Sequence, residues 1–253
     1  MTDAEELLKH RFLELAKKAD SGGYFTFTDF LGLSEQSAFS EISRSVRVKY
    51  TTFGGADGAE RIMIRFGDKE ELGYEMPFPI SVVRVRPKDP KFREKLTHRD
   101  YLGSLLALGI ERTVLGDIVL TDKATYIFVK EDMAKFVADS LSKVRRTDVV
   151  AEIIADSEVP DSSLYKTEIR RITVESERLD AILARVYSLS RGDAQALIHK
   201  RLVYVEGRLC ESVSYRPKPD ERISTRGYGR IIYRGVVGTT RRDRLALSVE
   251  VYV

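Results

Sequence analysis

Two short helical patterns followed at once by a hairpin pattern, all within residues 179–209, restrict the possible folds of this 253-residue chain most strongly. Apolar residues within 179–186 recur at i, i+3, i+4 and i+7, which gives one helix a single apolar face. Ser190, with Asp193 three positions later, is typical of a helix start, and Lys200-Arg201 place positive charge at the end of that second helix.

The strand pattern that follows predicts a small sheet beside these two helices. Val203 and Val205 alternate with Tyr204, and Glu206-Gly207 turns the chain back toward another strand at 222–226. Glutamate is a poor residue for the positive φ of a tight turn, so the geometry of this turn stays open. Basic residues occupy the helix ends and turns, where they can reach phosphates without disturbing a core.

The charge of the chain is distributed unevenly. Residues 170–253 hold 17 Lys+Arg against 10 Asp+Glu, a net charge of +7, whereas residues 1–169 hold 25 against 29, a net charge of −4. A basic last third attached to a mildly acidic remainder predicts a polyanionic partner, although a solvated basic face explains the charge alone equally well.

The remainder of the chain predicts an α+β fold in two further domains. In domain 1–76 we expect helices at 3–19 and 34–44, and strands through 46–50 and 62–66 on either side of a glycine-rich turn. In domain 77–155 the predicted order is βαββαβ, a ferredoxin-like arrangement shared by RNA-recognition folds and by domains that never bind RNA. These βαββαβ elements are expected at 80–85, 97–108, 117–120, 125–130, 131–141 and 148–154.

Residues 156–170 are predicted to form a linker to the basic domain 171–253, which ends in a β-hairpin extension with Thr239–Arg244 at its tip. The only cysteine, Cys210, cannot form an internal disulfide, the acidic start lacks the apolar core of a signal peptide, and no apolar stretch is long enough for a spanning helix. We therefore expect a cytoplasmic monomer. Three scattered histidines support no metal site, and no cofactor or small-molecule substrate is expected.

The succession of motifs in the basic domain resembles the S4 RNA-binding domain of a ribosomal protein, tyrosyl-tRNA synthetases and pseudouridine synthases. Nearly the whole chain, moreover, is similar to the YlmH family of bacterial S4-domain RNA-binding proteins. The S4 motifs are Arg178-Leu179-Asp180, Ser190-Arg191 and Val203-Tyr204-Val205-Glu206-Gly207, and the family motifs are Gly54-Gly55 with Ala59-Glu60-Arg61, then 96–103, 108–112, 116–118 and 224–230.

This resemblance implies a non-catalytic protein that binds rRNA of the large ribosomal subunit and peptidyl-tRNA during the rescue of stalled translation. The residues expected to contact RNA are Arg178, Ser190, Arg191, Lys200, Arg201, Arg208, Arg226, Arg230, Arg241, Arg242 and Arg244.

A second RNA contact in the central domain is possible at four residues. Tyr126 and Phe128 share one face of a predicted strand and could stack on bases, with burial in the core as the alternative. His98 and Arg99 could contact rRNA, but we expect His98-Arg99-Asp100 chiefly to cap the following helix.

Two other classes of protein compete with this interpretation. An S4-bearing pseudouridine synthase needs a catalytic aspartate after Arg-Leu, which Asp180 superficially provides, but a first-turn acid favoured by the helix dipole explains Asp180 better. A scaffold protein for cell division would leave the basic clustering unexplained and would bind its partners at high salt.

Overall fold

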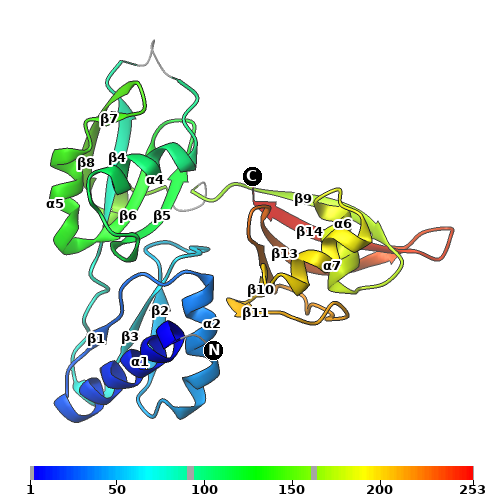
Figure 1. The fold of residues 1–253 in the computed structure, drawn as a ribbon, viewed down its shortest axis with the longest axis horizontal. Helices are drawn as coiled ribbons and strands as arrows, with labels where there is room; N and C mark the ends of the chain where they lie inside the picture. The colour runs from blue at the N-terminus through cyan, green and yellow to red at the C-terminus, as the bar shows by residue number, and fades with distance from the viewer. Residues whose placement is uncertain (1–2, 90–93, 161–163, 253) are drawn as a thin grey trace. The chain divides into compact units, whose positions relative to one another are not determined.

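The computed structural model describes residues 3–89, 94–160 and 164–252, and the chain divides into two compact units, Met1–Leu164 and Tyr165–Val253 (Figure 1). The first unit contains both the N-terminal and the central domains predicted from the sequence. The second contains the basic domain.

The N-terminal part of the first unit packs two helices on a three-stranded antiparallel sheet of order β1-β3-β2. Its core contains three phenylalanine rings that pack edge to face. The ring centroids of Phe12 and Phe39 are 5.4 Å apart, and those of Phe39 and Phe66 are 5.9 Å apart. The elements are α1 (Asp3–Gly22), β1 (Thr26–Phe27), α2 (Leu33–Ile42), η1 (Ser43–Ser45), β2 (Tyr50–Phe53), β3 (Met63–Phe66) and α3 (Lys69–Leu72).

One expected strand in this part starts later than its alternation predicts. The pattern at 46–50 predicts a strand from Val46, but the chain leaves the turn η1 without pairing, and β2 begins at Tyr50. Val48 is nevertheless buried in the core, which accounts for its apolar character without a sheet position.

The central part has the predicted βαββαβ order. Its sheet is antiparallel with the order β5-β6-β4-β8-β7, and the short strand β7 is an addition to the expected pattern. Helices α4 and α5 cover one face (Figure 1). The elements are β4 (Ile80–Pro87), α4 (His98–Ala107), η3 (Arg112–Val114), β5 (Leu115–Leu120), β6 (Thr125–Lys130), α5 (Glu131–Ser140), β7 (Lys143–Val144), β8 (Thr147–Ile154) and η4 (Asp156–Glu158).

A half-buried ionic and hydrogen-bonded joint fastens the N-terminal part to the central sheet. The carboxylate of Asp117 in β5 accepts hydrogen bonds from the backbone N–H groups of Glu60 and Arg61, at 2.8 and 2.9 Å. The Arg61 guanidinium donates to the carbonyl oxygens of Leu115 (2.7 Å) and Arg112 (3.0 Å). The two predicted domains 1–76 and 77–155 are therefore closely linked, and the boundary between them remains a prediction.

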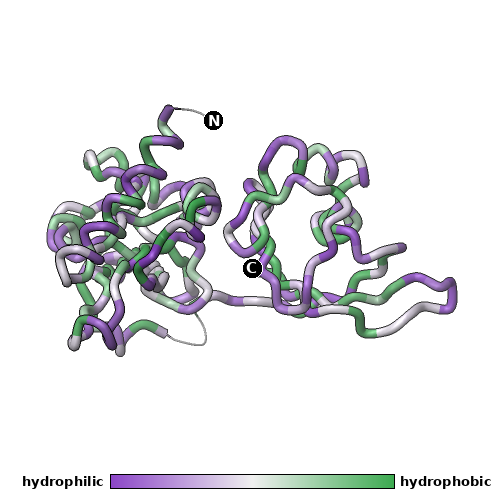
Figure 2. Tube along the Cα trace, turned by 90° about the horizontal axis from the view of Figure 1, so that it is seen from below, coloured by the Kyte–Doolittle hydropathy of each residue, from purple (hydrophilic) through white to green (hydrophobic). Residues whose placement is uncertain are grey.

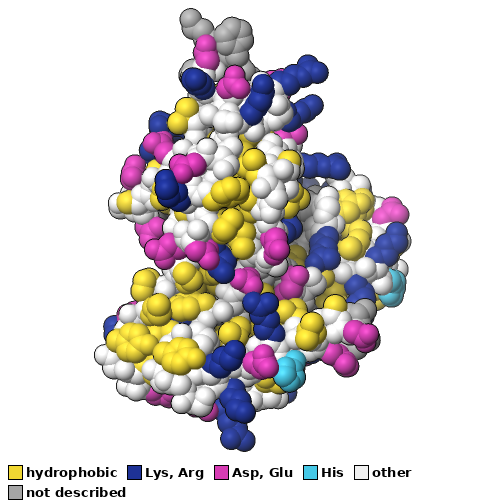
Figure 3. Space-filling model, turned by 60° about the vertical axis from the view of Figure 1, so that its left-hand side comes forward, with side chains coloured by type: hydrophobic (Ala, Val, Ile, Leu, Met, Phe, Trp, Pro, Cys, Tyr) yellow, Lys and Arg dark blue, Asp and Glu magenta, His cyan; other side chains and the backbone are white. Residues whose placement is uncertain are grey.

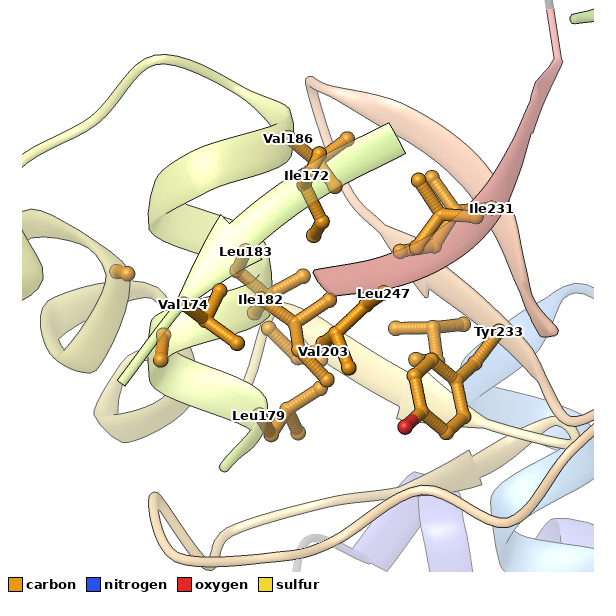
Figure 4. Packing of buried hydrophobic residues seen from close by; sticks show 14 of the residues in the cluster. Ile172, Val174, Leu179, Ile182, Leu183, Val186, Val203, Ile231, Tyr233 and Leu247 are labelled. Carbon is orange, nitrogen blue, oxygen red and sulfur yellow. The ribbon is translucent and has the colours of Figure 1, made fainter. Parts of the chain in front are cut away.

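The second unit is a six-stranded antiparallel sheet of order β11-β10-β12-β13-β14-β9, with α6 and α7 on one face. Apolar side chains from the two helices and from this face of the sheet form one core (Figure 4). The elements are β9 (Thr167–Val174), α6 (Leu179–Val186), α7 (Arg191–His199), β10 (Val203–Val205), β11 (Arg208–Leu209), β12 (Arg222–Thr225), β13 (Gly229–Thr239) and β14 (Leu245–Tyr252).

The predicted linker 156–170 is too long at its C-terminal end. β9 begins at Thr167 and pairs with β14 along its whole length, from Thr167 opposite Tyr252 to Val174 opposite Leu245. This end of the strand has no alternation of buried apolar residues, because its side chains at Glu168, Ile169 and Arg170 are all exposed. Only the pairing with β14 shows that it belongs to the sheet.

The Asp117 joint can be tested by substitution. Asp117→Ala leaves the backbone N–H groups of Glu60 and Arg61 without their acceptor, and we expect it to lower the free energy of unfolding by about 2 kcal/mol. Urea unfolding followed by circular dichroism measures this change. Exposed Asp57→Ala is the matched control and should change stability by less than about 0.5 kcal/mol; an equal effect of both substitutions would contradict a specific role for Asp117.

Candidate RNA-binding surface

The two helices of the second unit are joined at their N-terminal ends by a buried carboxylate. The side chain of Asp180, in the first turn of α6, has no exposed area. It accepts hydrogen bonds from Arg178 Nε (3.1 Å), Arg191 Nη2 (3.0 Å) and Gln195 Nε2 (2.8 Å). One carboxylate therefore holds two arginines, one at the start of each helix.

Asp180 stays ionised because its hydrogen-bond partners offset the cost of burying its charge. Burial by itself raises the pKa of Asp180, but the hydrogen bonds from Gln195, Arg178 and Arg191 outweigh it, and the pKa is lowered overall. The side chains of Arg178 and Arg191 remain 35% and 43% exposed. Two cations against one buried anion leave a surplus positive charge that faces solvent, in fixed positions from which guanidinium groups can bind phosphates.

Ser190 caps α7 as its sequence position predicts. Its hydroxyl oxygen accepts a hydrogen bond from the backbone N–H of Asp193 at 3.0 Å and donates to the Asp193 carboxylate at 2.6 Å. This cap fixes the first turn of α7, in which Arg191 is the first residue. Ser190 thus positions Arg191.

A second group of expected contacts lies where α7 ends and the β10–β11 hairpin turns. Lys200, Arg201 and Arg208 are all exposed, and Arg201 has φ +59° and lies 3.7 Å from Glu211 in a solvent-exposed ion pair. Such pairs contribute little and open readily. These three cations are therefore available to a polyanion.

The geometry of the β10–β11 turn, which the sequence leaves undecided, is that of a tight hairpin turn although Glu206 occupies its first position. Glu206 and Gly207 have φ +48° and +72°, as a tight two-residue hairpin turn requires. The Glu206 carboxylate accepts a hydrogen bond from the backbone N–H of Arg222 at 2.5 Å and lies 3.5 Å from its guanidinium. These contacts offset the backbone strain at Glu206.

The arginines after β12 stack on tyrosines. The Arg226 guanidinium lies 5.2 Å from the ring centroid of Tyr204, and that of Arg230 lies 4.2 Å from Tyr252 and 5.3 Å from Tyr165. Stacking of this kind orders a guanidinium while its edge remains able to donate hydrogen bonds.

The tip of the last hairpin is basic, as expected. Arg241, Arg242 and Arg244 are exposed between β13 and β14, and Figure 2 shows this projecting turn as hydrophilic. Arg244 forms an exposed ion pair with Glu175 at 3.2 Å. Nothing in the structure brings these three residues to the Asp180 cluster, so they form a separate group.

The proposed second contact in the central part is corrected at two positions. Tyr126 and Phe128 are 5% and 0% exposed, so neither ring can stack on a base in this structure. Phe128 is covered because Gly116 and Gly55 lie against it; a Cβ atom on either glycine would approach Phe128 to within 3 Å.

His98 and Arg99 are exposed at the start of α4. The expected cap is present beside them: the Asp100 carboxylate accepts hydrogen bonds from the backbone N–H and hydroxyl of Thr97, at 2.8 and 2.7 Å. Partial desolvation, and then the charge of Arg112, lower the pKa of His98, which therefore carries less positive charge near pH 6 than an unperturbed histidine.

Sequence reasoning missed two residues of the second unit. Gln195 is the third donor to Asp180, and its position one helical turn after Arg191 was the available signal. Tyr228 is 45% exposed and packs on Tyr187, with ring centroids 5.4 Å apart, between the two stacked arginines Arg226 and Arg230. Its place in an Arg-Gly-Tyr-Gly-Arg turn was the signal there.

The described ranges show neither a metal cluster nor a spanning helix. Among these residues no three His, Cys, Asp or Glu side chains come together in a way that could hold a metal ion. No helix within the same ranges is long and apolar enough to cross a bilayer.

Comparisons with known proteins agree with this geometry. Residues 177–223 match the S4 domain family, and residues 75–158 match the family described as "Putative RNA-binding domain in YlmH". The helix pair, its basic ends and the hairpin are thus those of an S4-type RNA-binding domain.

A curated relative and a solved structure extend the likeness beyond single domains. The chain is 33% identical over 225 residues to the ribosome-associated protein quality control protein P2 of Bacillus subtilis, covering 88% of this chain and 86% of the relative. The chain belongs to the YlmH family of S4-domain RNA-binding proteins. The solved cell division protein ylmH from Streptococcus pneumoniae shares the fold at 20% identity and a TM-score of 0.50, covering 64% of this chain and 97% of that one.

The Asp180 cluster predicts a pH-dependent loss of stability. Asp180→Asn keeps the shape but removes the charge that holds two arginines, and we expect it to lower the free energy of unfolding at pH 7 by about 2 to 3 kcal/mol. The pKa of Asp180 is lower in the folded state than the unfolded value of about 3.9, so its contribution is complete above pH 3.9 and is lost as the pH falls below that value.

Urea titrations at pH 7, 5 and 3 compare wild type with Asp180→Asn. The difference between wild type and Asp180→Asn should be constant from pH 7 to about pH 5 and should narrow toward pH 3. Asp243→Asn, which changes an exposed carboxylate in the turn between β13 and β14, is the control. A difference that stays the same at pH 3 would contradict an ionised Asp180.

Proposed function

We propose that this protein binds structured RNA of the large ribosomal subunit, together with the backbone of peptidyl-tRNA, and acts in the rescue of stalled translation in the cytoplasm. Support comes from the S4-type surface and from the relative whose name records a ribosome-associated quality control role. We propose further that it does so as a monomer, without catalysis and without a cofactor.

The observation that carries this proposal is the pair of arginines held by Asp180. Arg178 and Arg191 come from two helices, and the shared carboxylate fixes the positions of both guanidinium groups before RNA arrives. A preorganised pair loses little side-chain entropy on binding two phosphates. Because phosphate contacts position a protein without reading sequence, we infer that the RNA is recognised mainly by its shape.

The same cluster argues against a pseudouridine-synthase-like role for Asp180. A catalytic carboxylate has to touch its substrate, whereas the Asp180 side chain has no exposed area and its oxygens already accept hydrogen bonds from three side chains. Asp180 instead positions Arg178 and Arg191. This use of Asp180 supports a binding protein.

Co-sedimentation with large ribosomal subunits tests the proposal. Full-length protein would be sedimented with 30S, 50S and 70S particles, with and without P-site tRNA, over a range of salt concentrations. We expect salt-dependent binding to 50S particles that strengthens with tRNA. Four to six phosphate contacts should give a log-log salt slope of roughly −3 to −5.

The variant Lys200→Ala/Arg201→Ala/Arg208→Ala removes three exposed cations while leaving the Asp180 cluster intact. We expect its affinity for 50S particles to fall by about 10- to 100-fold at 0.15 M salt, and its salt slope to become shallower by about 2 to 3. Lys17→Ala/Lys18→Ala/Arg47→Ala makes the same change of charge at exposed positions of the N-terminal part and is the matched control. Equal affinities of the two variants for 50S particles, or an affinity that does not change with salt concentration, would overturn the proposal.

A further inference from the structure

We propose that the basic cleft between α4 and the β7–β8 hairpin is a second RNA-binding site, which takes backbone phosphates; this inference rests on the proposed RNA-binding function. The cleft lies within the first unit, far along the sequence from the S4 domain. It is independent of the sheet face on which RNA-recognition folds usually stack bases.

The cleft has room for a nucleotide backbone and is lined by groups that bind phosphate. Its volume is about 630 Å³, within the range of small-ligand sites. α4 contributes Arg99 and Ser104, and the segment from the end of α5 through β7 contributes Ser142, Lys143 and Arg145. Guanidinium, ammonium and hydroxyl groups are the side-chain donors that proteins most often use for phosphate oxygens.

The charge of the lining favours an anion. Three cations, Arg99, Lys143 and Arg145, face the single lining carboxylate of Asp100. Arg145 lies 3.6 Å from Asp100 and is 62% exposed; Lys143 lies 3.8 Å from Asp148 and is 58% exposed. Both cations are largely exposed and both pairs are long, so a phosphate can compete for Lys143 and Arg145. Figure 3 shows Lys and Arg side chains interspersed with Asp and Glu side chains over one face of the protein.

The turn that presents Arg145 is strained. Arg145 and Arg146 join β7 to β8 in a two-residue turn, and Arg145 has φ +53°. Glycine or asparagine takes this conformation at lower cost. This turn holds the charge of Arg145 at the rim of the cleft, where a binding role would use it.

The two aromatic rings on the sheet face opposite α4 and α5 are not open to base stacking. Phe128 on that face is fully buried against Gly55 and Gly116, and Tyr126 beside it is 5% exposed. Base stacking by these two rings is therefore excluded. A purely structural explanation also exists for Lys143 and Arg145, because cations near the C-terminus of α5 interact favourably with its dipole, and the experiment separates the two.

Gly103 makes the cleft testable without removing any existing contact. It lines the cleft from the middle of α4, and a Cβ atom placed on it meets nothing within 4 Å. A side chain there enters open space, and replacing a helical glycine favours the helix. Gly103→Glu therefore puts a negative charge into the cleft of a folded protein, and Gly103→Gln is the neutral control of equal size.

The affinity of full-length protein for Bacillus subtilis 50S particles would be measured over a salt series. We expect Gly103→Glu to bind at least about fivefold more weakly than Gly103→Gln, with a salt slope shallower by about 1, while both variants unfold at or above the temperature of the wild type. Affinities of the Glu and Gln variants within twofold of each other would overturn the proposal, since a structural role for Lys143 and Arg145 predicts no difference.

A crosslinking experiment distinguishes failure of this site from failure of the S4 surface. A benzophenone maleimide would be attached at Gly103→Cys in one protein and at exposed His199→Cys, beside Lys200, in another; the natural Cys210 is buried. RNA crosslinks from residue 103 support the cleft. Crosslinks from residue 199 alone overturn the cleft and leave the proposed function intact, whereas crosslinks from neither overturn both.

Discussion

The buried carboxylate of Asp180 is the interaction on which the helix pair of the second unit and its two arginines Arg178 and Arg191 depend. A charge without solvent contact is costly unless its oxygens are satisfied, and here Arg178, Arg191 and Gln195 satisfy them. These contacts have two effects. They keep Asp180 ionised, and they fix the starts of α6 and α7 relative to each other with two guanidinium groups at the surface. One residue thus affects both the stability of the helix pair and the positions of two surface charges.

The rest of the second unit supports that cluster. α6 and α7 have only eight and nine residues, too few to be stable alone, and their apolar faces are buried against the six-stranded sheet. In the first unit a carboxylate also joins two segments, because Asp117 holds the N-terminal part against the central sheet. Here the aromatic rings that could stack on bases, Tyr126 and Phe128, are buried. Because Tyr126 and Phe128 are buried, the exposed cations are the RNA contacts that we propose.

Much of the architecture was predictable because local patterns agreed with the final packing. The apolar spacing in 179–186, the serine cap at Ser190 and the alternation in 203–205 each specify an element by themselves, and the βαββαβ order follows from alternation and spacing in the same way. The start of β9 was not predictable, since Glu168, Ile169 and Arg170 are exposed and only their pairing with β14 places them in a strand. Val48 shows the reverse case, a buried residue in an alternating pattern without a strand.

The sequence by itself determined the fold class, the family and the location of positive charge, because these depend on composition and on contacts between near neighbours. Only the tertiary structure decided which of those charges act together. It joined Arg178 to Arg191 through Asp180, buried Tyr126 and Phe128, and placed Arg99 across a cleft from Lys143 and Arg145. Each of these results depends on long-range packing, and burial and pairing between distant residues leave no periodic signal in a single sequence.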